Sequence, residues 1–277
     1  MNYQLLALDM DGTVLNSRKE ITPRTGEAIR KALREGYDVL FSTGRNLSEM
    51  REYLARFPEM RYAICCSGAL VKDLHTGETL SIAPIGFGLV DQVLETVRGM
   101  DVNIVYFIGD DLYASTAVRG RLEHYNCQCF HELHEACAIW VEDPCSMALE
   151  KPDEILKLNL FFHDPEEYRQ ACAAFDRQGI SHPSGIPYNC EISCPGVNKA
   201  AGIQLLCDYL GISMEQAIAC GDEGNDREMI LVSGLGVAMG NASEPIKRIA
   251  DVIVADCDHD GVAEVIETYL GKPVLRK

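Results

Sequence analysis

The sequence lacks any apolar run long enough to cross a bilayer, and its N-terminus has no basic segment of the kind that opens a signal peptide. It also lacks internal repeats and low-complexity linkers. Positive charge is scarce, because 25 Lys and Arg residues stand against 42 Asp and Glu residues and the formal net charge is -17. A field of that sign repels nucleic acids and anionic membranes. We therefore expect a cytoplasmic protein with no nucleic-acid or membrane partner.

The composition sets limits on size and order. The chain has 277 residues, of which 47% are hydrophobic and 24% charged, so it can bury a core and form one large or two modest domains. Its twelve cysteines are expected to be reduced thiols that pack as small hydrophobic groups. One group is clustered along the chain: Cys127, Cys129, His131, His134 and Cys137. Its spacing matches no usual zinc pattern and would place 127, 129 and 131 on one face of a strand, which favours packing over a metal site.

Two carboxylates follow the first apolar run. Residues 5–8 are expected to form a buried strand, because they show no helical stripe and a glycine turn follows. Asp9 and Asp11 then emerge on the same side at the carboxyl end, where α/β sheets bind ligands. They would repel by roughly 4 kcal/mol at about 4 Å and an effective dielectric near 20, which indicates that a cation or a proton separates their roles. A calcium loop is disfavoured, because Val14 stands where that loop needs glycine.

Strands and helices alternate along the first 83 residues. Thr22 is the expected N-cap of a helix that runs from Pro23 to about Glu35, with Gly36 past its end. The further elements expected here are strands at 37–41 and 62–66 and a helix at 47–57. Such alternation implies right-handed crossovers between parallel strands. We therefore expect an α/β fold with a Rossmann-like, doubly wound parallel-sheet core.

The middle of the chain has a different order of expected helices and strands. Expected elements there are helices at 88–98 and 165–178 and strands at 103–108, 112–115 and 155–162. We interpret 84–187 as an α/β cap domain inserted into a core made of 1–83 and 188–277. The last third returns to the core pattern, with a helix at 199–209 and strands at 217–220 and 236–239. The glycines from 234 to 240 do not form a dinucleotide fingerprint, because their spacing differs from G-x-G-x-x-G.

Four groups of polar residues lie at the ends of expected strands or at the starts of expected helices. They are the Asp9/Asp11 pair, Thr43, Lys199, and the group Asp222, Asn225 and Asp226. Each alone is a common capping or surface pattern. Together they supply a carboxylate nucleophile with a partner, a hydroxyl donor, a cation and further carboxylates that could bind a metal.

These residues resemble the four motifs of the haloacid dehalogenase superfamily. The matching segments are Asp9-Met10-Asp11-Gly12-Thr13, Thr43-Gly44-Arg45, Lys199 and Gly221-Asp222-Glu223-Gly224-Asn225-Asp226. The insertion between the second and third motifs, and segments 236–242 and 260–263, resemble the Cof-type branch, whose members carry an α/β cap at that place. One departure is Ser67-Gly68-Ala69, where many relatives have Asn-Gly-Ala, and it affects one polar contact near the expected site.

The resemblance implies a role for each matching residue. Asp9 would attack phosphorus to form an aspartyl-phosphate, and Asp11 would protonate the leaving group and then deprotonate the attacking water. Mg²⁺ would be the cofactor, held by Asp9, Asp222 and the backbone carbonyl of Asp11. The residues expected to bind phosphate or substrate are Thr43, Gly44, Lys199 and Asn225. Asp226 would support the metal site from behind.

The function that the resemblance implies is Mg²⁺-dependent phosphatase activity on a small phosphorylated metabolite, with sugar phosphates the favoured class. We expect the cap to select the substrate and the protein to be a monomer or a weak homo-oligomer. A phosphomutase of the same superfamily is the first alternative, and release of inorganic phosphate separates the two. A non-catalytic phosphate-binding or signalling protein is the second. A relic of that kind should have lost a motif residue, and none is missing.

Overall fold

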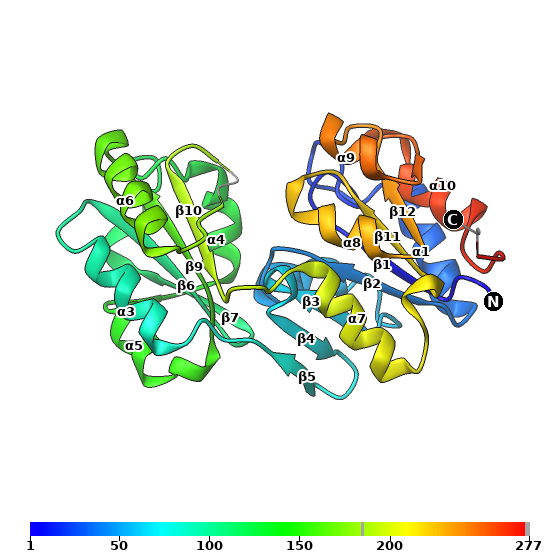
Figure 1. Cartoon of the computed structure of the whole chain (residues 1–277), viewed down its shortest axis with the longest axis horizontal. Coiled ribbons are helices and arrows are strands. Elements are labelled where there is room, and N and C mark those ends of the chain that lie inside the picture. Colours follow the sequence, from blue (N-terminus) through cyan, green and yellow to red (C-terminus); the bar gives the residue numbers. More distant parts are fainter. Residues whose placement is uncertain (184–185, 275–277) are drawn as a thin grey trace. The chain divides into compact units, whose positions relative to one another are not determined.

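A computed structural model describes residues 1–183 and 186–274 of the chain. These residues form two α/β units (Figure 1). The first unit comprises Met1–Arg45, Glu52–Ser81 and Val197–Lys277, and the second comprises Asn46–Arg51 and Ile82–Gly196. Within the described ranges, no helix has both the length and the apolar composition that a membrane span requires.

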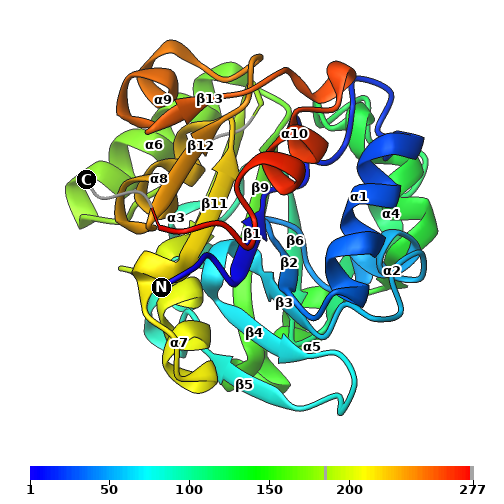
Figure 2. The same cartoon turned by 90° about the vertical axis from the view of Figure 1, so that its right-hand side faces the viewer.

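The sheet of the first unit is built around β1, which lies in its middle (Figure 2). In the described chain its strand order is β13-β12-β11-β1-β2-β3-β4-β5. The strands are β1 (Leu5–Leu8), β2 (Asp38–Ser42), β3 (Tyr62–Cys65), β4 (Leu70–Asp73), β5 (Thr79–Ile82), β11 (Ala217–Gly221), β12 (Leu235–Ala238) and β13 (Val252–Ile253). All pairings from β13 to β3 are parallel, and β4 runs antiparallel to β3. The predicted parallel, Rossmann-like α/β core is confirmed, and the antiparallel extension was not predicted.

Helices cover both faces of this sheet (Figure 2). They are α1 (Pro23–Arg34), α2 (Arg51–Leu54), α7 (Lys199–Leu210), α8 (Arg227–Val232), α9 (Glu244–Ile249) and α10 (Gly261–Thr268). Residues of α7 and α8 pack against Leu5 and Ala7 on one face, while α1 lies beside α10. The Thr22 side chain accepts a hydrogen bond from the Thr25 N–H at 3.2 Å, so the predicted N-cap of α1 is confirmed.

The predicted helix at 47–57 is wrong in extent. A 3₁₀ turn covers Ser48–Met50, and α2 ends at Leu54. Two local features explain the short helix. The Asn46 side chain accepts from the Ser48 N–H at 3.0 Å, which holds a tight turn at the start. Pro58 disfavours the helical conformation of the residue before it, so the helix cannot continue through Phe57.

The second unit has its own sheet, with described strands in the order β10-β9-β6-β7-β8. The strands are β6 (Val102–Ile108), β7 (Asp111–Ser115), β8 (Ala138–Val141), β9 (Ile155–Phe162) and β10 (Asn189–Ser193). The helices are α3 (Phe87–Thr96), α4 (His131–Cys137), α5 (Pro144–Glu150) and α6 (Pro165–Gln178). One apolar core joins α3, α5 and α6 to the sheet through residues such as Val93, Ala148 and Phe175. Strand β10 pairs antiparallel with β9, which explains why it belongs to this unit although it lies beyond the predicted cap boundary at 187.

The cysteine and histidine group at 127–137 does not form a strand, which corrects the sequence interpretation. Cys127 precedes a 3₁₀ turn at Gln128–Phe130, and α4 follows directly. The Cys127 thiol donates to the Leu122 carbonyl at 3.3 Å, and the His134 ring stacks on Phe130 with ring centroids 5.5 Å apart. The group therefore contributes a thiol hydrogen bond and a ring stack to the interior of the second unit.

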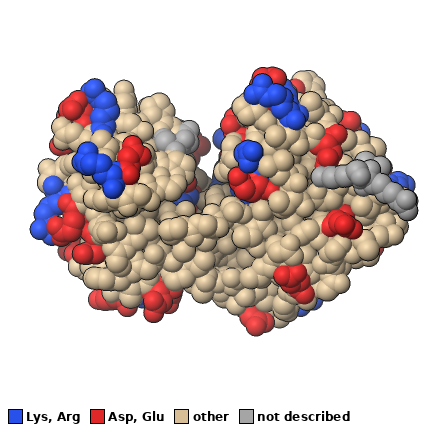
Figure 3. All heavy atoms as spheres, in the orientation of Figure 1, with Lys and Arg blue, Asp and Glu red and all other residues tan. Residues whose placement is uncertain are grey.

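Charged side chains are mixed on the face drawn in Figure 3. Acidic and basic groups lie near one another at several points on each unit, and the described Lys and Arg residues form no long stripe on this face. The excess of acidic residues is therefore not accompanied by a basic groove on the surface that this view shows.

Candidate active site

Three neighbouring strands of the first unit end at the same level. Leu8 of β1 is in register with both Phe41 of β2 and Cys220 of β11. The residues that follow these strand ends therefore meet at one edge of the sheet, and they include Asp9, Thr43 and Asp222. The chain leaves β1 toward β2 on one side and later returns to β11 on the other. That reversal is the place where parallel α/β sheets form ligand-binding crevices.

A buried lysine joins two aspartates at this edge. Lys199 Nζ lies 2.5 Å from Asp9 Oδ1 and 2.6 Å from Asp226 Oδ1. Lys199 and Asp226 are fully buried, and Asp9 is 5% exposed. The other oxygen of Asp226 accepts hydrogen bonds from the backbone N–H groups of Asp222 and Glu223, at 2.9 and 3.1 Å. Asp226 thus fixes Lys199, and Lys199 fixes one oxygen of Asp9.

Burial and pairing act in opposite directions on these ionisable groups. Burial lowers the pKa of Lys199, but Asp9 and Asp226 outweigh it and the pKa lies above its ordinary value. Burial raises the pKa of Asp9, and the nearby Asp226 adds to this effect against the pull of Lys199. One lysine is therefore shared between two buried carboxylates, which leaves negative charge to be compensated.

Asp222 faces Asp9 from the end of β11. Its Oδ1 accepts from the Thr13 hydroxyl at 3.3 Å, and its Oδ2 accepts from Asn241 Nδ2 at 3.1 Å. Asn241 also donates to the Gly12 carbonyl at 2.8 Å, which ties the loop after β1 to Asp222. Burial, followed by the charges of Asp226 and Glu223, raises the pKa of Asp222 to about 7. Among the described residues, no lysine or arginine forms an ion pair with Asp222.

The donor set fits a divalent cation. Asp9, Asp222 and Asp226 each offer an oxygen atom within 4.8 Å of the others. Asp226 already accepts from Lys199 and two backbone N–H groups, so Asp9 and Asp222 are better placed to receive an ion. A hard, oxygen-seeking cation would supply the charge compensation that these buried carboxylates lack. The fit supports the predicted metal site, in which Asp226 supports the ligands from behind.

Asp11 has different surroundings from Asp9. Arg45 Nε and Nη2 both donate to its carboxylate at 2.8 Å, and Lys19 Nζ adds a third contact at 2.8 Å. Burial alone would raise the pKa of Asp11, but these two cations hold it well below its usual range. Asp9 and Asp11 therefore differ in acidity, because burial raises the pKa of Asp9 and two cations lower the pKa of Asp11.

The remaining predicted residues lie around the same strand ends. Thr43 is buried, and its Oγ1 accepts from the Arg45 N–H at 3.2 Å, which leaves the hydroxyl hydrogen to donate elsewhere. A Cβ built on Gly44 would lie 3.4 Å from Ser67 Oγ and 4.0 Å from Asn225 Nδ2. Gly44, Asn225 and Ser67 are thus neighbours, and Ser67 still places a polar group where many relatives have asparagine.

Sequence reasoning missed four residues that contact the predicted ones: Arg45, Lys19, Thr13 and Asn241. Arg45, Thr13 and Asn241 lie inside segments that carried the resemblance, but no role was given to them. Lys19 and Arg45 reach Asp11 from positions 8 and 34 residues away. Local sequence gives no signal for such pairings, because an exposed lysine or arginine is usually solvated.

Known proteins resemble this chain along most of its length. The sequence matches the haloacid dehalogenase-like hydrolase family over residues 6–266. The chain is 30% identical to the Bacillus subtilis 5-amino-6-(5-phospho-D-ribitylamino)uracil phosphatase YitU, over 96% of this chain and 97% of that protein. It is 28% identical to the putative phosphatase YxeH of the same organism, over 98% and 100%. A crystal structure of a haloacid dehalogenase-like hydrolase from Bacteroides thetaiotaomicron is 27% identical, with a TM-score of 0.84 and coverage of 96% and 99%.

The chain therefore belongs to the haloacid dehalogenase-like hydrolases. This membership confirms the predicted superfamily, its Cof-type branch and the α/β fold, because the matches extend through the inserted unit. It also confirms the predicted enzyme class, a phosphoric monoester hydrolase of the haloacid dehalogenase type. The similar proteins are named phosphatases, and the chain matches them over almost their full length.

Proposed function

We propose that this protein is a Mg²⁺-dependent phosphatase that hydrolyses a small phosphorylated metabolite through an aspartyl-phosphate on Asp9. The observation that carries this proposal is the buried Asp9–Lys199–Asp226 arrangement beside Asp222. A structural ion pair needs only one carboxylate for one lysine. Asp222 is a third buried carboxylate, and its raised pKa indicates a site that binds a cation.

Asp9 is the proposed nucleophile. Lys199 holds its Oδ1 at 2.5 Å, so Oδ2 is the oxygen that attacks phosphorus. The new O–P bond forms as the ester O–P bond breaks, and water later cleaves the aspartyl-phosphate to inorganic phosphate. Hydrolysis of phosphate monoesters is among the slowest uncatalysed reactions, so the site must lower the barrier by about 20 kcal/mol or more. Lys199, Thr43, Gly44 and Asn225 are proposed to position the phosphoryl oxygens.

Asp11 is the proposed acid and base. The structure holds it as a carboxylate, which is the form that deprotonates the attacking water. It can protonate a leaving alkoxide only after it gains a proton itself. We therefore propose that its contacts with Arg45 and Lys19 loosen when substrate binds.

Asp9, Asp222 and the backbone carbonyl of Asp11 are the proposed ligands of Mg²⁺. When bound, the ion would supply positive charge to the phosphoryl oxygens and to the carboxylates around them. Asp226 would remain bonded to Lys199 and to the backbone N–H groups of Asp222 and Glu223, and so keep the ligands in place.

The second unit is the proposed substrate-selecting cap, and the favoured substrate is a sugar phosphate or a metabolite with a phosphorylated sugar-like chain. This class is supported by one similar protein, which is named for a substrate with a phosphorylated ribityl chain.

A phosphate-release screen tests the proposal. The panel should contain sugar phosphates, a ribityl phosphate, nucleotides and pyridoxal phosphate, each with Mg²⁺ and with excess chelator. We expect phosphate release that requires Mg²⁺ and is abolished in Asp9→Asn. Asp208→Asn is a matched control, because Asp208 is an exposed aspartate on α7 and should leave activity unchanged. Full activity in chelator or in Asp9→Asn would overturn the mechanism, and substrate isomerisation without phosphate release would indicate a phosphomutase.

A further inference from the structure

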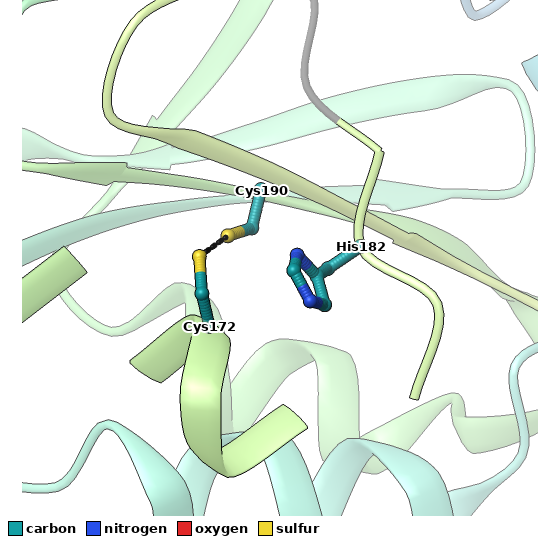
Figure 4. A group of neighbouring side chains, drawn as sticks. All are labelled: Cys172, His182 and Cys190. Carbon is teal, nitrogen blue, oxygen red and sulfur yellow. Dashed lines mark hydrogen bonds between the residues drawn. The ribbon is translucent and has the colours of Figure 1, made fainter. Parts of the chain in front are cut away.

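The second unit contains a cluster of two cysteines and a histidine. Cys172 lies on α6, His182 in the segment after that helix, and Cys190 on β10. Each residue offers one ligand atom within 4.8 Å of the other two. Figure 4 shows the two sulfur atoms facing each other with the imidazole ring beside them. The three side chains thus converge from separate parts of the chain.

The separation of the two sulfur atoms fits a shared metal ion. Cys172 Sγ lies 3.7 Å from Cys190 Sγ. A zinc ion with about 2.3 Å bonds and tetrahedral angles places two sulfur ligands about 3.8 Å apart. A disulfide would require about 2.05 Å. The contact is a hydrogen bond between the two thiols, and its length also suits two thiolates bound to one tetrahedral ion.

The histidine is oriented in the way that metal-binding histidines are. His182 Nε2 lies 3.1 Å from Asp176 Oδ1, and the ring packs against the buried Phe175 with ring centroids 5.7 Å apart. If Nε2–H donates to Asp176, the neutral imidazole presents the lone pair of Nδ1 for coordination. A carboxylate behind the histidine is the usual partner of a metal-ligating imidazole, because it fixes the tautomer and the ring.

The two thiols lie in the apolar core of the second unit. Cys190 is fully buried there, and Cys172 packs against the same core. Thiols held together in this way lose their protons when a metal ion binds them.

We propose that Cys172, His182 and Cys190 bind one Zn²⁺ ion as two thiolates and one neutral imidazole, with a water molecule as fourth ligand. Each thiol releases its proton to solvent, so about two protons are released for each ion bound. The two thiolates balance the charge of the ion. Sulfur and nitrogen donors select zinc over Mg²⁺, which prefers oxygen. The ion would tie α6 and the residue His182 to β10 and so stabilise the second unit.

Cobalt spectroscopy on the full chain gives a direct test that does not depend on phosphatase activity. The protein is stripped of metal, kept reduced with a phosphine and supplied with excess Mg²⁺ to fill sites built from oxygen donors. Co²⁺ is then added as the probe. We expect a sulfur-to-cobalt charge-transfer band that saturates at one equivalent and disappears when one equivalent of Zn²⁺ is added. A wild-type protein without that band would overturn the proposal.

Variants identify the ligands. Cys172→Ser and Cys190→Ser should each weaken the band and Zn²⁺ binding, whereas Cys129→Ser should leave both unchanged, because Cys129 is an exposed cysteine of the same unit. His182→Ala keeps both thiols and should also weaken Zn²⁺ binding. Asp176→Asn should weaken it by about 10- to 100-fold through loss of the partner of His182. Circular dichroism confirms that each variant is folded. Equal bands in wild type and in a folded Cys172→Ser/Cys190→Ser double variant would show that other cysteines bind the metal.

Discussion

Arg45 forms a bidentate contact with Asp11: its Nε donates to Asp11 Oδ2 and its Nη2 donates to Oδ1, both at 2.8 Å. The guanidinium also lies 5.4 Å from the centre of the Tyr53 ring, which holds it in place. A two-point contact of this kind favours the ionised carboxylate strongly. The residue proposed as acid and base is therefore kept in its basic form until the contact changes.

Replacing Arg45 should change the pH dependence of turnover. Since Arg45 lowers the pKa of Asp11, Arg45→Gln should raise that pKa and keep Asp11 protonated up to a higher pH. With a nitrophenyl phosphate, whose leaving group needs little protonation, the acidic limb of the kcat profile should move to higher pH. Arg45→Lys keeps a positive charge and should move it less. An acidic limb at the same pH in Arg45→Gln would mean that Asp11 is not the group that titrates.

A side chain at position 12 should damage the metal site. Gly12 has a φ of +78°, and a Cβ there would lie 2.2 Å from Asp222 Oδ2. Gly12→Ala should therefore displace Asp222, weaken the Mg²⁺ dependence of turnover and lower activity. Gly77→Ala is the matched control, because its φ is +75° and a Cβ there meets nothing within 4 Å. Both variants share a backbone cost of about 1–2 kcal/mol, so equal effects on activity would exclude the proposed clash.

The shared lysine should be essential for stability as well as for chemistry. Lys199→Met leaves two buried carboxylates without their cation, and loss of one partner of a buried pair costs about 3–5 kcal/mol. Asp226→Asn removes one of those carboxylates, so the double variant Lys199→Met/Asp226→Asn should be more stable than Lys199→Met alone. Urea unfolding without added metal measures the three free energies of unfolding. If the loss of unfolding free energy in the double variant equalled the sum of the losses in the two single variants, Lys199 and Asp226 would not act as one unit.

The buried His134 should make stability depend on pH. Burial lowers the pKa of His134 from 6.5 to about 4, and its Nδ1 has no hydrogen-bond partner among the described residues. The unfolded chain therefore binds this proton at a higher pH than the folded one. As a result, the stabilising effect of neutral His134 is present above pH 6.5 and is lost as the pH falls toward 4.

His134→Phe, which keeps the ring against Phe130, should remove this contribution. The difference in unfolding free energy between wild type and variant should change by at most about 3 kcal/mol between neutral pH and pH 4. Urea titrations at several pH values measure it. A difference that stays constant across this range would mean that His134 titrates in the same way in both states.

The position of the site could be predicted because local signals coincide with strand ends. Asp9, Thr43 and Asp222 each follow a short apolar run, and the register of β1 with β2 and β11 brings their ends together. The burial of Lys199 could not be predicted, because a lysine at a helix start is usually solvated. The burial of Lys199 depends on the close approach of two segments that are distant in the sequence. Gly68 lies so near Asn198 that a Cβ at position 68 would come within 2.2 Å of the Asn198 carbonyl oxygen.

The second unit was harder to predict because its arrangement also depends on contacts between segments that are distant in the sequence. The predicted strands β6 and β9 are long and rich in apolar residues, whereas α4 has seven residues and β8 only four. The cluster of Cys172, His182 and Cys190 has spacings of nine and seven intervening residues, which match no usual zinc pattern. Only the pairing of β10 with β9 and the packing of α6 bring these residues together.

The central claim is that Asp9 carries the phosphoryl group and Asp11 moves protons. Rapid-quench kinetics of Asp11→Asn with a nitrophenyl phosphate and Mg²⁺ tests it most directly, because the first displacement needs little acid while the attack of water lacks its base. We predict a burst of nitrophenol close to one equivalent of enzyme, a slow steady state, and a phosphorylated Asp9 in the quenched protein. A sugar phosphate should lose much more of its first-step rate in the same variant, and Asp9→Asn should show no burst. Equal losses with both substrates and no phosphorylated Asp9 would contradict the account.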